Sequence, residues 1–301
     1  MNLKSVTGKS WKLNNADNNK ILKLTEEFSL SEILCRLLVI RNIFGKDVKE
    51  FLNPDLKKQI PNPYIFKDMK VSVEHIYGLI KERSIIGIFG DYDVDGASST
   101  AMLIKFFTKI NQPYSFFIPD RQKDGYGPSV ATFDKFIKKK IKTIITVDCG
   151  TLSNEVVDYG NTKNVSTIIL DHHQADINLP KALGIINPNR IDDSSKLKYL
   201  CATSIVFFFL LALNKKLKDT NWYQENNIKK PELLEYIDLI ALATICDVVP
   251  LVGLNRSFVK HGLKVIHKRK NLGIKMLSDI SNISSSPSTY DLGYIFGPKI
   301  N

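Results

Sequence analysis

The sequence predicts an α/β protein with a doubly wound, mostly parallel sheet, and two observations support this prediction. From Val71 onward, short continuous apolar runs alternate with segments in which apolar residues recur at helical spacing. Strands buried on both faces of a parallel sheet have such continuous runs, and strand–helix alternation is typical of β-α-β units. Polar residues directly follow three of the runs, as expected where parallel strands end beside a ligand.

Residues 1–70 are predicted to form a helical N-terminal segment. Apolar residues recur at helical spacing from Ser31 to Phe44, and three prolines then interrupt the chain before the alternating region begins. We expect the α/β domain to span 71–255 and a further helical segment to span 256–301.

The predicted elements of the α/β domain follow one another in a regular order. They are helix 71–83, strand 85–89, helix 97–111, strand 114–118, helix 129–140, strand 143–147, helix 153–159 and strand 166–170. Ile205 to Leu213 is an apolar run too short to span a membrane, so a buried helix is expected there. Pro231 to Ile245 has the wide apolar face of a core helix.

The first strand of this domain ends in an acidic loop that contains Asp91, Asp93 and Asp95. Three carboxylates this close repel one another unless a positive charge neutralises them, and a divalent cation is the simplest candidate. The alternative is a solvated turn in which Asp95 or Ser98 caps the next helix. An EF-hand loop is excluded, because Met102 stands where that loop needs a bidentate glutamate.

Two further strand ends carry candidate ligands. Asp148 directly follows one strand, and His172 and His173 stand behind Asp171 at the end of the next. Because the carboxyl ends of parallel strands meet at one edge of the sheet, we expect these side chains to converge. Asp247 ends an apolar helix, where an unpaired carboxylate would be costly, and it is expected to join them.

The chemistry of these residues favours hard divalent cations. Carboxylates and imidazoles suit Mn²⁺ or Mg²⁺, and there are more candidate ligands than one ion needs, so two ions are expected. Two such ions can activate a water and stabilise the leaving oxygen of a displacement at phosphorus, which predicts phosphoester hydrolysis. Cys149 and Cys246 would allow a zinc site, but no C-x-x-C pair supports that alternative.

Composition and charge bound the function classes. The chain has 301 residues, of which 44% are hydrophobic, enough for a sizeable core. Its formal net charge of +11 favours a polyanionic partner, nucleic acid first, although a lysine-rich genome would give the same excess. The N-terminus lacks the apolar region of a signal peptide, and the four cysteines are dispersed, so a cytoplasmic protein is expected.

Several motifs carry a resemblance to a known family. DYDVDG, VDCG, DHH and CDVVP resemble, in this order, the motifs of the DHH phosphoesterase superfamily, and RQKDGYG, INPNR and FGPKIN resemble its bacterial single-strand-specific DNA exonucleases. Phe89 agrees with that branch, because several smaller members of the superfamily have a metal-binding histidine there. The resemblance implies metal ligands at Asp93, Asp95, Asp148, His172, His173 and Asp247.

The resemblance also gives roles to five other residues. Asp91 would shape the acidic loop, and Asp171 would bind metal or orient the histidines from behind. Arg121 would hold a DNA phosphate and Tyr126 would stack on a base. Lys299 stands where these exonucleases have an arginine, which reduces a bidentate phosphate contact to a point charge.

The function implied by the resemblance is 5′-to-3′ hydrolysis of single-stranded DNA to mononucleotides, with two Mn²⁺ or Mg²⁺ ions, in recombination and repair. The implied partners are single-stranded DNA, a single-strand-binding protein and a helicase. Two alternatives stay open: a small-substrate enzyme such as a pyrophosphatase or oligonucleotidase, and a non-catalytic DNA-binding relative of the same fold. Members of this branch would continue past residue 301 into a second, DHHA1-like domain that closes the nucleic-acid cleft.

Overall fold

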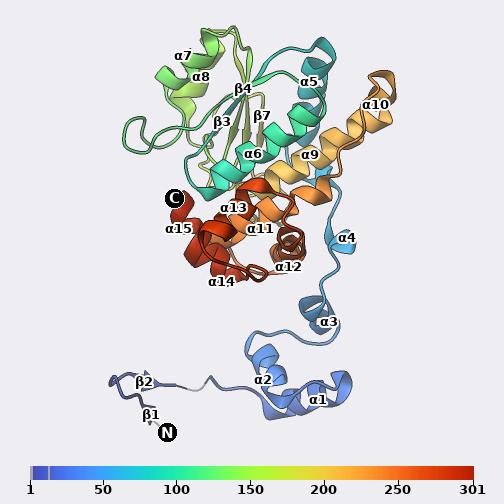
Figure 1. The fold of residues 1–301 in the computed structure, drawn as a ribbon, viewed down its shortest axis with the longest axis vertical. Helices are drawn as coiled ribbons and strands as arrows, with labels where there is room; N and C mark the ends of the chain where they lie inside the picture. Colours follow the sequence, from blue (N-terminus) through green and yellow to red (C-terminus); the bar gives the residue numbers. More distant parts are fainter. Residues whose placement is uncertain (1–2, 13) are drawn as a thin grey trace. The chain divides into compact units, whose positions relative to one another are not determined.

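The computed structural model describes residues 3–12 and 14–301 (Figure 1). It contains two compact units, Met1–Asp55 and Leu56–Asn301, and each is described by itself. The division of the chain that we expect from the sequence, after residues 70 and 255, stays a prediction.

The N-terminal unit combines a small hairpin with three helices. Its elements are β1 (Leu3–Lys4), β2 (Ser10–Trp11), α1 (Asn18–Phe28), α2 (Glu32–Ile40) and α3 (Lys46–Leu52). The side chain of Asp17 accepts a hydrogen bond from the N–H of Asn19 and caps α1. The hairpin is absent from the sequence prediction, because strands of two residues leave no alternating pattern.

The second unit contains a five-stranded sheet. Its strands, in order across the sheet, are β4 (Tyr114–Phe117), β3 (Ile86–Gly90), β5 (Thr143–Val147), β6 (Ser166–Leu170) and β7 (Gly184–Ile186). Every neighbouring pair is parallel, which confirms the predicted α/β fold. The sequence prediction lacks β7, because this strand has only three residues and follows β6 through an irregular loop.

Helices cover both faces of the sheet (Figure 1). One face carries α5 (Met69–Glu82), α6 (Val94–Lys109) and α9 (Ala202–Asp219), and the other carries α7 (Val130–Ile137) and α8 (Asn154–Thr162). Side chains alternate between the two faces along each strand. In β5, Ile145 and Val147 join the core with α5, α6 and α9, whereas Ile144 packs with Phe133 and Phe136 of α7.

The chain reverses its direction across the sheet at β3. β4 lies on one side of β3, whereas β5, β6 and β7 extend on the other side. Right-handed connections then place α6 on one face and α7 and α8 on the opposite face. The strand order therefore reverses between β3 and β5, and open α/β sheets bind their ligands beside the carboxyl ends of the strands at such a point.

The helices after residue 236 are drawn in orange to red in Figure 1, and the first of them packs against α6 and α9. They are α11 (Ile237–Cys246), α12 (Gly253–His267), α13 (Leu272–Ile280), α14 (Thr289–Asp291), a π-helical turn (Leu292–Phe296) and α15 (Gly297–Ile300). Shorter elements are α4 (Leu56–Gln59), α10 (Trp222–Glu225) and the 3-10 turns Pro63–Ile65 and Leu233–Tyr236. The helix predicted at 231–245 therefore begins as a 3-10 turn.

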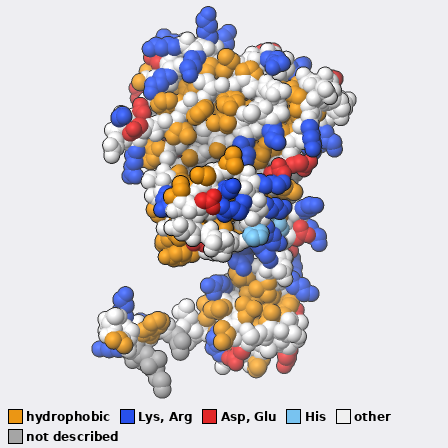
Figure 2. All heavy atoms as spheres, in the orientation of Figure 1, with side chains coloured by type: hydrophobic (Ala, Val, Ile, Leu, Met, Phe, Trp, Pro, Cys, Tyr) orange, Lys and Arg blue, Asp and Glu red, His pale blue; other side chains and the backbone are white. Residues whose placement is uncertain are grey.

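The surface is mixed in character. Figure 2 shows Lys and Arg side chains scattered among hydrophobic and acidic ones on the visible face. Among the helices formed by residues 3–12 and 14–301, none is both long and apolar enough to cross a membrane. The apolar run 205–213 lies within α9 and is buried almost throughout, as predicted.

Candidate metal centre

Four chain segments meet at the carboxyl edge of the sheet. They are the loops that follow β3, β5 and β6, together with the C-terminal end of α11. These segments carry the carboxylates and imidazoles that the sequence predicts as ligands. The structure therefore brings that set together at the point where the strand order reverses.

The loop after β3 turns directly into α6. Asp93 is the N-cap, because its Oδ1 accepts a hydrogen bond from the N–H of Gly96 at 2.9 Å. The helix consequently begins at Val94, three residues before the predicted start, and the caps considered at positions 95 and 98 are wrong. Only glycine fits at position 96, since a Cβ would lie 2.4 Å from the carbonyl oxygen of Asp91.

Asp95 lies in the first turn of α6 and points at the N-terminus of α9. Its carboxylate accepts hydrogen bonds from the N–H of Ala202 at 2.6 Å and from the N–H and hydroxyl of Thr203 at 2.8 and 2.6 Å. Burial outweighs these donors and raises the pKa of Asp95. The N-terminus of α9 thus fixes the carboxylate of Asp95. Oδ2 of Asp95 lies 3.8 Å from Nε2 of His172.

Asp148 follows β5 in a left-handed backbone conformation. Its φ of 61° is uncommon outside glycine, and such conformations cluster at functional sites. Its Oδ1 is buried without a hydrogen-bond partner. Burial, and then the neighbouring carboxylates of Asp95 and Asp93, raise the pKa of Asp148 well above its usual range. A carboxylate in this setting needs a proton or a cation.

Asp171 organises the two histidines. Its Oδ1 accepts hydrogen bonds from the N–H of His172 at 2.8 Å and of His173 at 3.2 Å, and it lies 2.8 Å from Nδ1 of His173. Burial works to raise the pKa of Asp171, but hydrogen bonds from His173 and Thr151 outweigh it and hold the pKa at about 2. The bond to Asp171 also raises the pKa of His173.

The imidazole of His172 stands among three carboxylates. Its Nε2 lies 3.3 Å from Oδ1 of Asp148 and 3.6 Å from Oδ2 of Asp247, in addition to its approach to Asp95. Three trios have ligand atoms within 4.8 Å of one another: Asp148–His172–His173, Asp95–His172–Asp247 and Asp91–Asp93–Asp148. Asp148 and His172 each belong to two trios, so neighbouring trios share a ligand. Two metal ions close together would share ligands in this way.

The donor set fits divalent cations. Buried ligand atoms without a hydrogen-bond partner are Asp91 Oδ1, Asp148 Oδ1, His172 Nε2 and Asp247 Oδ2. Burial raises the pKa of Asp91 and of Asp247 to about 6. Unpaired acceptors crowded by like charges are costly without a cation, and this combination of oxygen and imidazole ligands suits Mn²⁺ or Mg²⁺. Asp91, expected only to shape the loop, becomes a candidate ligand as well.

Comparison with known proteins decides the family. The family model described as "DHH family, N-terminal domain" matches residues 85–244, which is more than half of the chain. The chain belongs to the DHH family. The single-stranded-DNA-specific exonuclease RecJ of Salmonella typhimurium is 38% identical over 233 residues, which cover 76% of this chain and 40% of that relative. RecJ of Bacillus subtilis is 28% identical over 292 residues, which cover 97% of this chain and 35% of that relative.

Solved structures of RecJ share the fold of this DHH domain. A crystal structure of exonuclease RecJ bound to manganese aligns with a TM-score of 0.68 and 26% identity, over 81% of this chain and 58% of that chain. RecJ of Thermus thermophilus in complex with Mn²⁺ aligns with a TM-score of 0.75 and 23% identity, over 95% of this chain and 39% of that chain. The chain is therefore a RecJ-like DHH domain that spans roughly two fifths of the curated relatives.

Two of the three predicted substrate contacts lie beside the centre. The guanidinium of Arg121 lies over the ring of Tyr92, with Cζ 5.5 Å from the ring centre. Tyr126 packs edge-on against Tyr92 and His173, with ring centres 6.4 and 6.2 Å away. Both predicted side chains are exposed, so a bound strand could reach them.

Lys299, the third predicted contact, is exposed in α15. Two residues later, Oδ1 of Asn301 accepts a hydrogen bond from the N–H of Val94 at 3.0 Å. The segment that carries Lys299 is thereby fixed at the start of α6, directly after the acidic loop.

The thiols near the centre are engaged elsewhere. Sγ of Cys149 donates to the carbonyl oxygen of Val147 at 3.4 Å, and Sγ of Cys246 donates to that of Leu292 at 3.3 Å. Burial raises the pKa of both thiols, that of Cys246 to about 12. Zinc needs a thiolate, so these contacts argue against the zinc alternative.

Sequence reasoning predicted the orienting role of Asp171 but missed three other residues that hold the ligands. Thr203 binds Asp95, and the side chains of Asn187 and Asn189 bind the backbone of the histidine pair. A signal was available for the asparagines, because both belong to the INPNR motif noted above and follow the apolar run that forms β7. Since β7 itself was not predicted, these asparagines could not be recognised as residues at the end of a strand.

Proposed function

We propose that this DHH domain is the catalytic part of a metal-dependent exonuclease that hydrolyses single-stranded DNA. The observation that carries the proposal is Nε2 of His172, a buried atom without a hydrogen-bond partner that has three carboxylates at 3.3–3.8 Å. Two-metal sites built from such ligands perform in-line displacement at phosphorus. The RecJ relatives, named for their action on single-stranded DNA, supply the substrate class.

The proposed metal ligands are Asp93, Asp95, Asp148, His172, His173 and Asp247. When bound, two Mn²⁺ or Mg²⁺ ions would polarise the phosphoryl oxygens and activate a water for attack. Because Asp171 engages Nδ1 of His173, the Nε2 lone pair of that imidazole stays available as a ligand. Asp171 therefore acts as an orienting group. The metal-bearing domain would span 71–255, with 1–70 and 256–301 as additions.

The proposed contacts to the strand are Arg121, Tyr126 and Lys299. Arg121 would hold a backbone phosphate, Tyr126 would stack on a base, and Lys299 would add a point charge. The net charge of +11 favours such a polyanion. Cleavage from the 5′ end, release of mononucleotides, and action with a single-strand-binding protein and a helicase in recombination and repair complete the proposal by family resemblance.

The test is Mn²⁺-dependent digestion of a single-stranded oligonucleotide labelled at either end, with Asp148→Asn as the matched inactive variant. The wild-type chain should release mononucleotides from the 5′ end, and neither the variant nor the EDTA-treated chain should do so. Hydrolysis of pyrophosphate or dinucleotides without DNA digestion would support a small-substrate enzyme instead. DNA binding without hydrolysis of any of these substrates would support a non-catalytic relative.

A further inference from the structure

The loop after β7 supplies none of the proposed metal ligands, yet it connects the loops that do. Asn187 directly follows β7 and is fully buried. Its Nδ2 donates to the carbonyl oxygen of His173 at 2.9 Å and to Oγ1 of Thr151 at 2.9 Å. The N–H of Thr151 in turn donates to Oδ2 of Asp171 at 3.0 Å. A single side-chain amide therefore joins the loops after β5, β6 and β7.

Asn189 makes the matching contact to the other histidine. Its Nδ2 donates to the carbonyl oxygen of His172 at 2.5 Å, and its N–H donates to Oδ1 of Asn187 at 2.8 Å. Asp171 accepts from the N–H groups of the same two histidines. The backbone of the pair is thus held through its N–H groups on one side and through its carbonyl oxygens on the other.

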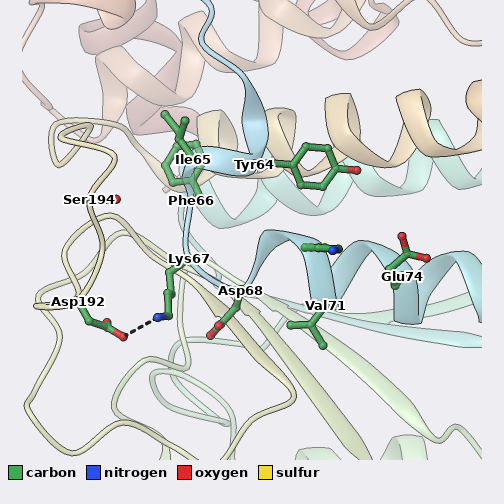
Figure 3. Close-up of a pocket in the computed structure, with 10 residues that line it drawn as sticks. Tyr64, Ile65, Phe66, Lys67, Asp68, Val71, Glu74, Asp192 and Ser194 are labelled. Carbon is green, nitrogen blue, oxygen red and sulfur yellow. Dashed lines mark ion pairs between the residues drawn. The ribbon is translucent and has the colours of Figure 1, made fainter.

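The same loop is anchored at the edge of the sheet. Arg190 is buried, and its guanidinium donates to Asp68, to Asp192 and, at 2.6 Å, to the carbonyl oxygen of Ile185. Oδ2 of Asp68 accepts from the N–H of Ile185 at 3.1 Å, so side chains pair the open edge of β7 in place of a sixth strand. Figure 3 shows Asp68 and Asp192 on the wall of a pocket of about 630 Å³, where Asp192 also pairs with Lys67.

We propose that Asn187 and Asn189 are positioning residues of the metal centre. Their amides fix the backbone of His172 and His173, and this fixes both imidazoles against Asp148. Removing either amide leaves a carbonyl oxygen of the histidine pair without its donor, so the loop would relax away from the carboxylates. Groups that support metal ligands from behind typically change metal affinity by about 10–100-fold. The inference rests on the proposed function, because it presupposes the metal centre.

The test compares Mn²⁺ binding by Asn187→Ala with that of a matched control, Asn214→Ala, in the EDTA-treated full chain. Asn214 is also a buried asparagine, and it lies in α9, away from the centre. Its Nδ2 donates to the carbonyl oxygen of Pro231 at 3.3 Å, and its Oδ1 accepts from the hydroxyl of Tyr223 at 2.6 Å. Electron paramagnetic resonance of free Mn²⁺ gives the dissociation constants. We expect both variants to unfold at lower temperature, but only Asn187→Ala to bind Mn²⁺ more weakly, by about tenfold or more.

Asn189→Ala is the second variant and keeps the test decisive if Asn187→Ala does not fold. This side chain is only half-buried, so we expect a smaller loss of Mn²⁺ affinity in a folded protein. If the Asn187 and Asn189 variants bind Mn²⁺ as tightly as Asn214→Ala does, the two asparagines serve packing only. That result would overturn this inference and leave the proposed metal centre intact. A wild-type chain that binds no Mn²⁺ would refute the metal centre itself, and this inference with it.

Discussion

The second unit contains two clusters of charged side chains, one around the buried Arg190 and one around the buried Asp95 and Asp148, and they differ in whether their charges are balanced. At the edge of β7, hydrogen bonds from Arg190 lower the pKa of Asp192, and the same guanidinium binds Asp68. At the candidate metal centre, burial and neighbouring carboxylates raise the pKa of Asp148 and of Asp247. The first cluster contains its own counter-charge, and the second requires one from outside.

Hydrogen bonding divides the two clusters in the same way. Nε, Nη1 and Nη2 of Arg190 each have an acceptor, whereas Oδ1 of Asp148 and Nε2 of His172 are buried without partners. Stability of the fold accounts for the arginine cluster, which closes the edge of a sheet. It does not account for the carboxylate cluster, which is unfavourable until cations bind. Unbalanced buried charge, more than buried charge as such, therefore distinguishes the candidate metal centre.

The largest expected effect concerns Asp148, which the proposed metal centre requires for hydrolysis. Asp148→Ala removes a carboxylate that belongs to two of the three trios, so we expect Mn²⁺-dependent hydrolysis to fall by about 10³-fold or more. Circular dichroism should show that the EDTA-treated variant stays folded, because the substitution also relieves repulsion among carboxylates. Hydrolysis at the wild-type rate by a folded Asp148→Ala protein would contradict the proposed site.

The balanced cluster should matter for stability instead. Arg190→Met removes one hydrogen-bond donor each from Asp68, Asp192 and the carbonyl oxygen of Ile185, so we expect the free energy of unfolding to fall by about 2–3 kcal/mol. Urea unfolding of the EDTA-treated protein measures this change. The matched control is Arg269→Met, whose side chain also pairs with an exposed carboxylate, that of Asp279, but is itself much less buried than Arg190, and it should cost much less. Equal losses in the two variants would remove the distinction.

Cations should stabilise the unbalanced cluster. Mn²⁺ at 100 times its dissociation constant is expected to raise the free energy of unfolding by about 2.7 kcal/mol for each site. Thermal unfolding with Mn²⁺ and with EDTA gives the difference. The same addition should leave Asp148→Ala close to its EDTA value, and a wild-type protein indifferent to Mn²⁺ would count against the centre.

The two clusters should also respond to pH in opposite directions. A pKa of about 6 for Asp91 and Asp247 lies above the unfolded value, so their contribution favours folding at low pH and is lost as pH rises through about 6. Asp192 has a lowered pKa, and its contribution is lost as pH falls. We expect the EDTA-treated protein to lose stability as pH rises from about 5 to about 7, and Asp247→Asn to reduce that loss. Urea unfolding across this range provides the measurement, and an unchanged slope in Asp247→Asn would refute the assignment.

The smallest expected effect concerns Arg121. If its guanidinium holds one backbone phosphate, Arg121→Ala should weaken single-strand binding for all sequences and reduce the salt slope by about one charge. Mn²⁺ affinity should stay the same, since Arg121 lies over Tyr92 and belongs to none of the ligand trios found among the described residues. Fluorescence anisotropy at several salt concentrations measures the slope, and an unaltered slope would return Arg121 to an ordinary surface residue.

Local patterns in the sequence predicted the sheet and the position of the candidate site. The strands predicted at 143–147 and 166–170 coincide with β5 and β6, because continuous apolar runs bounded by polar residues define them. Asp148 and His172 were found for the same reason, because the polar segments that contain them begin directly after those runs. The start of α6 was misplaced, because alternating carboxylates offer several possible caps and only the folded loop selects Asp93.

Contacts between distant residues could not be predicted in this way. The bond from Thr203 to Asp95 joins residues 108 positions apart, and that from Arg190 to Asp68 joins residues 122 positions apart. Hydrophobic periodicity carries no information about such pairs. The support that Asn187 gives to His173 belongs to the same class, since it depends on a three-residue strand that the pattern did not show.

The most direct test of the metal centre is the anomalous scattering of a crystal soaked in Mn²⁺. We predict two neighbouring peaks at the carboxyl edge of the sheet, with Asp148 and His172 both in contact with manganese, because these residues are shared between trios. The peaks should disappear in Asp148→Ala. Manganese bound elsewhere, or no peak among these carboxylates in a well-ordered crystal, would contradict the assignment of this cluster as a two-metal centre.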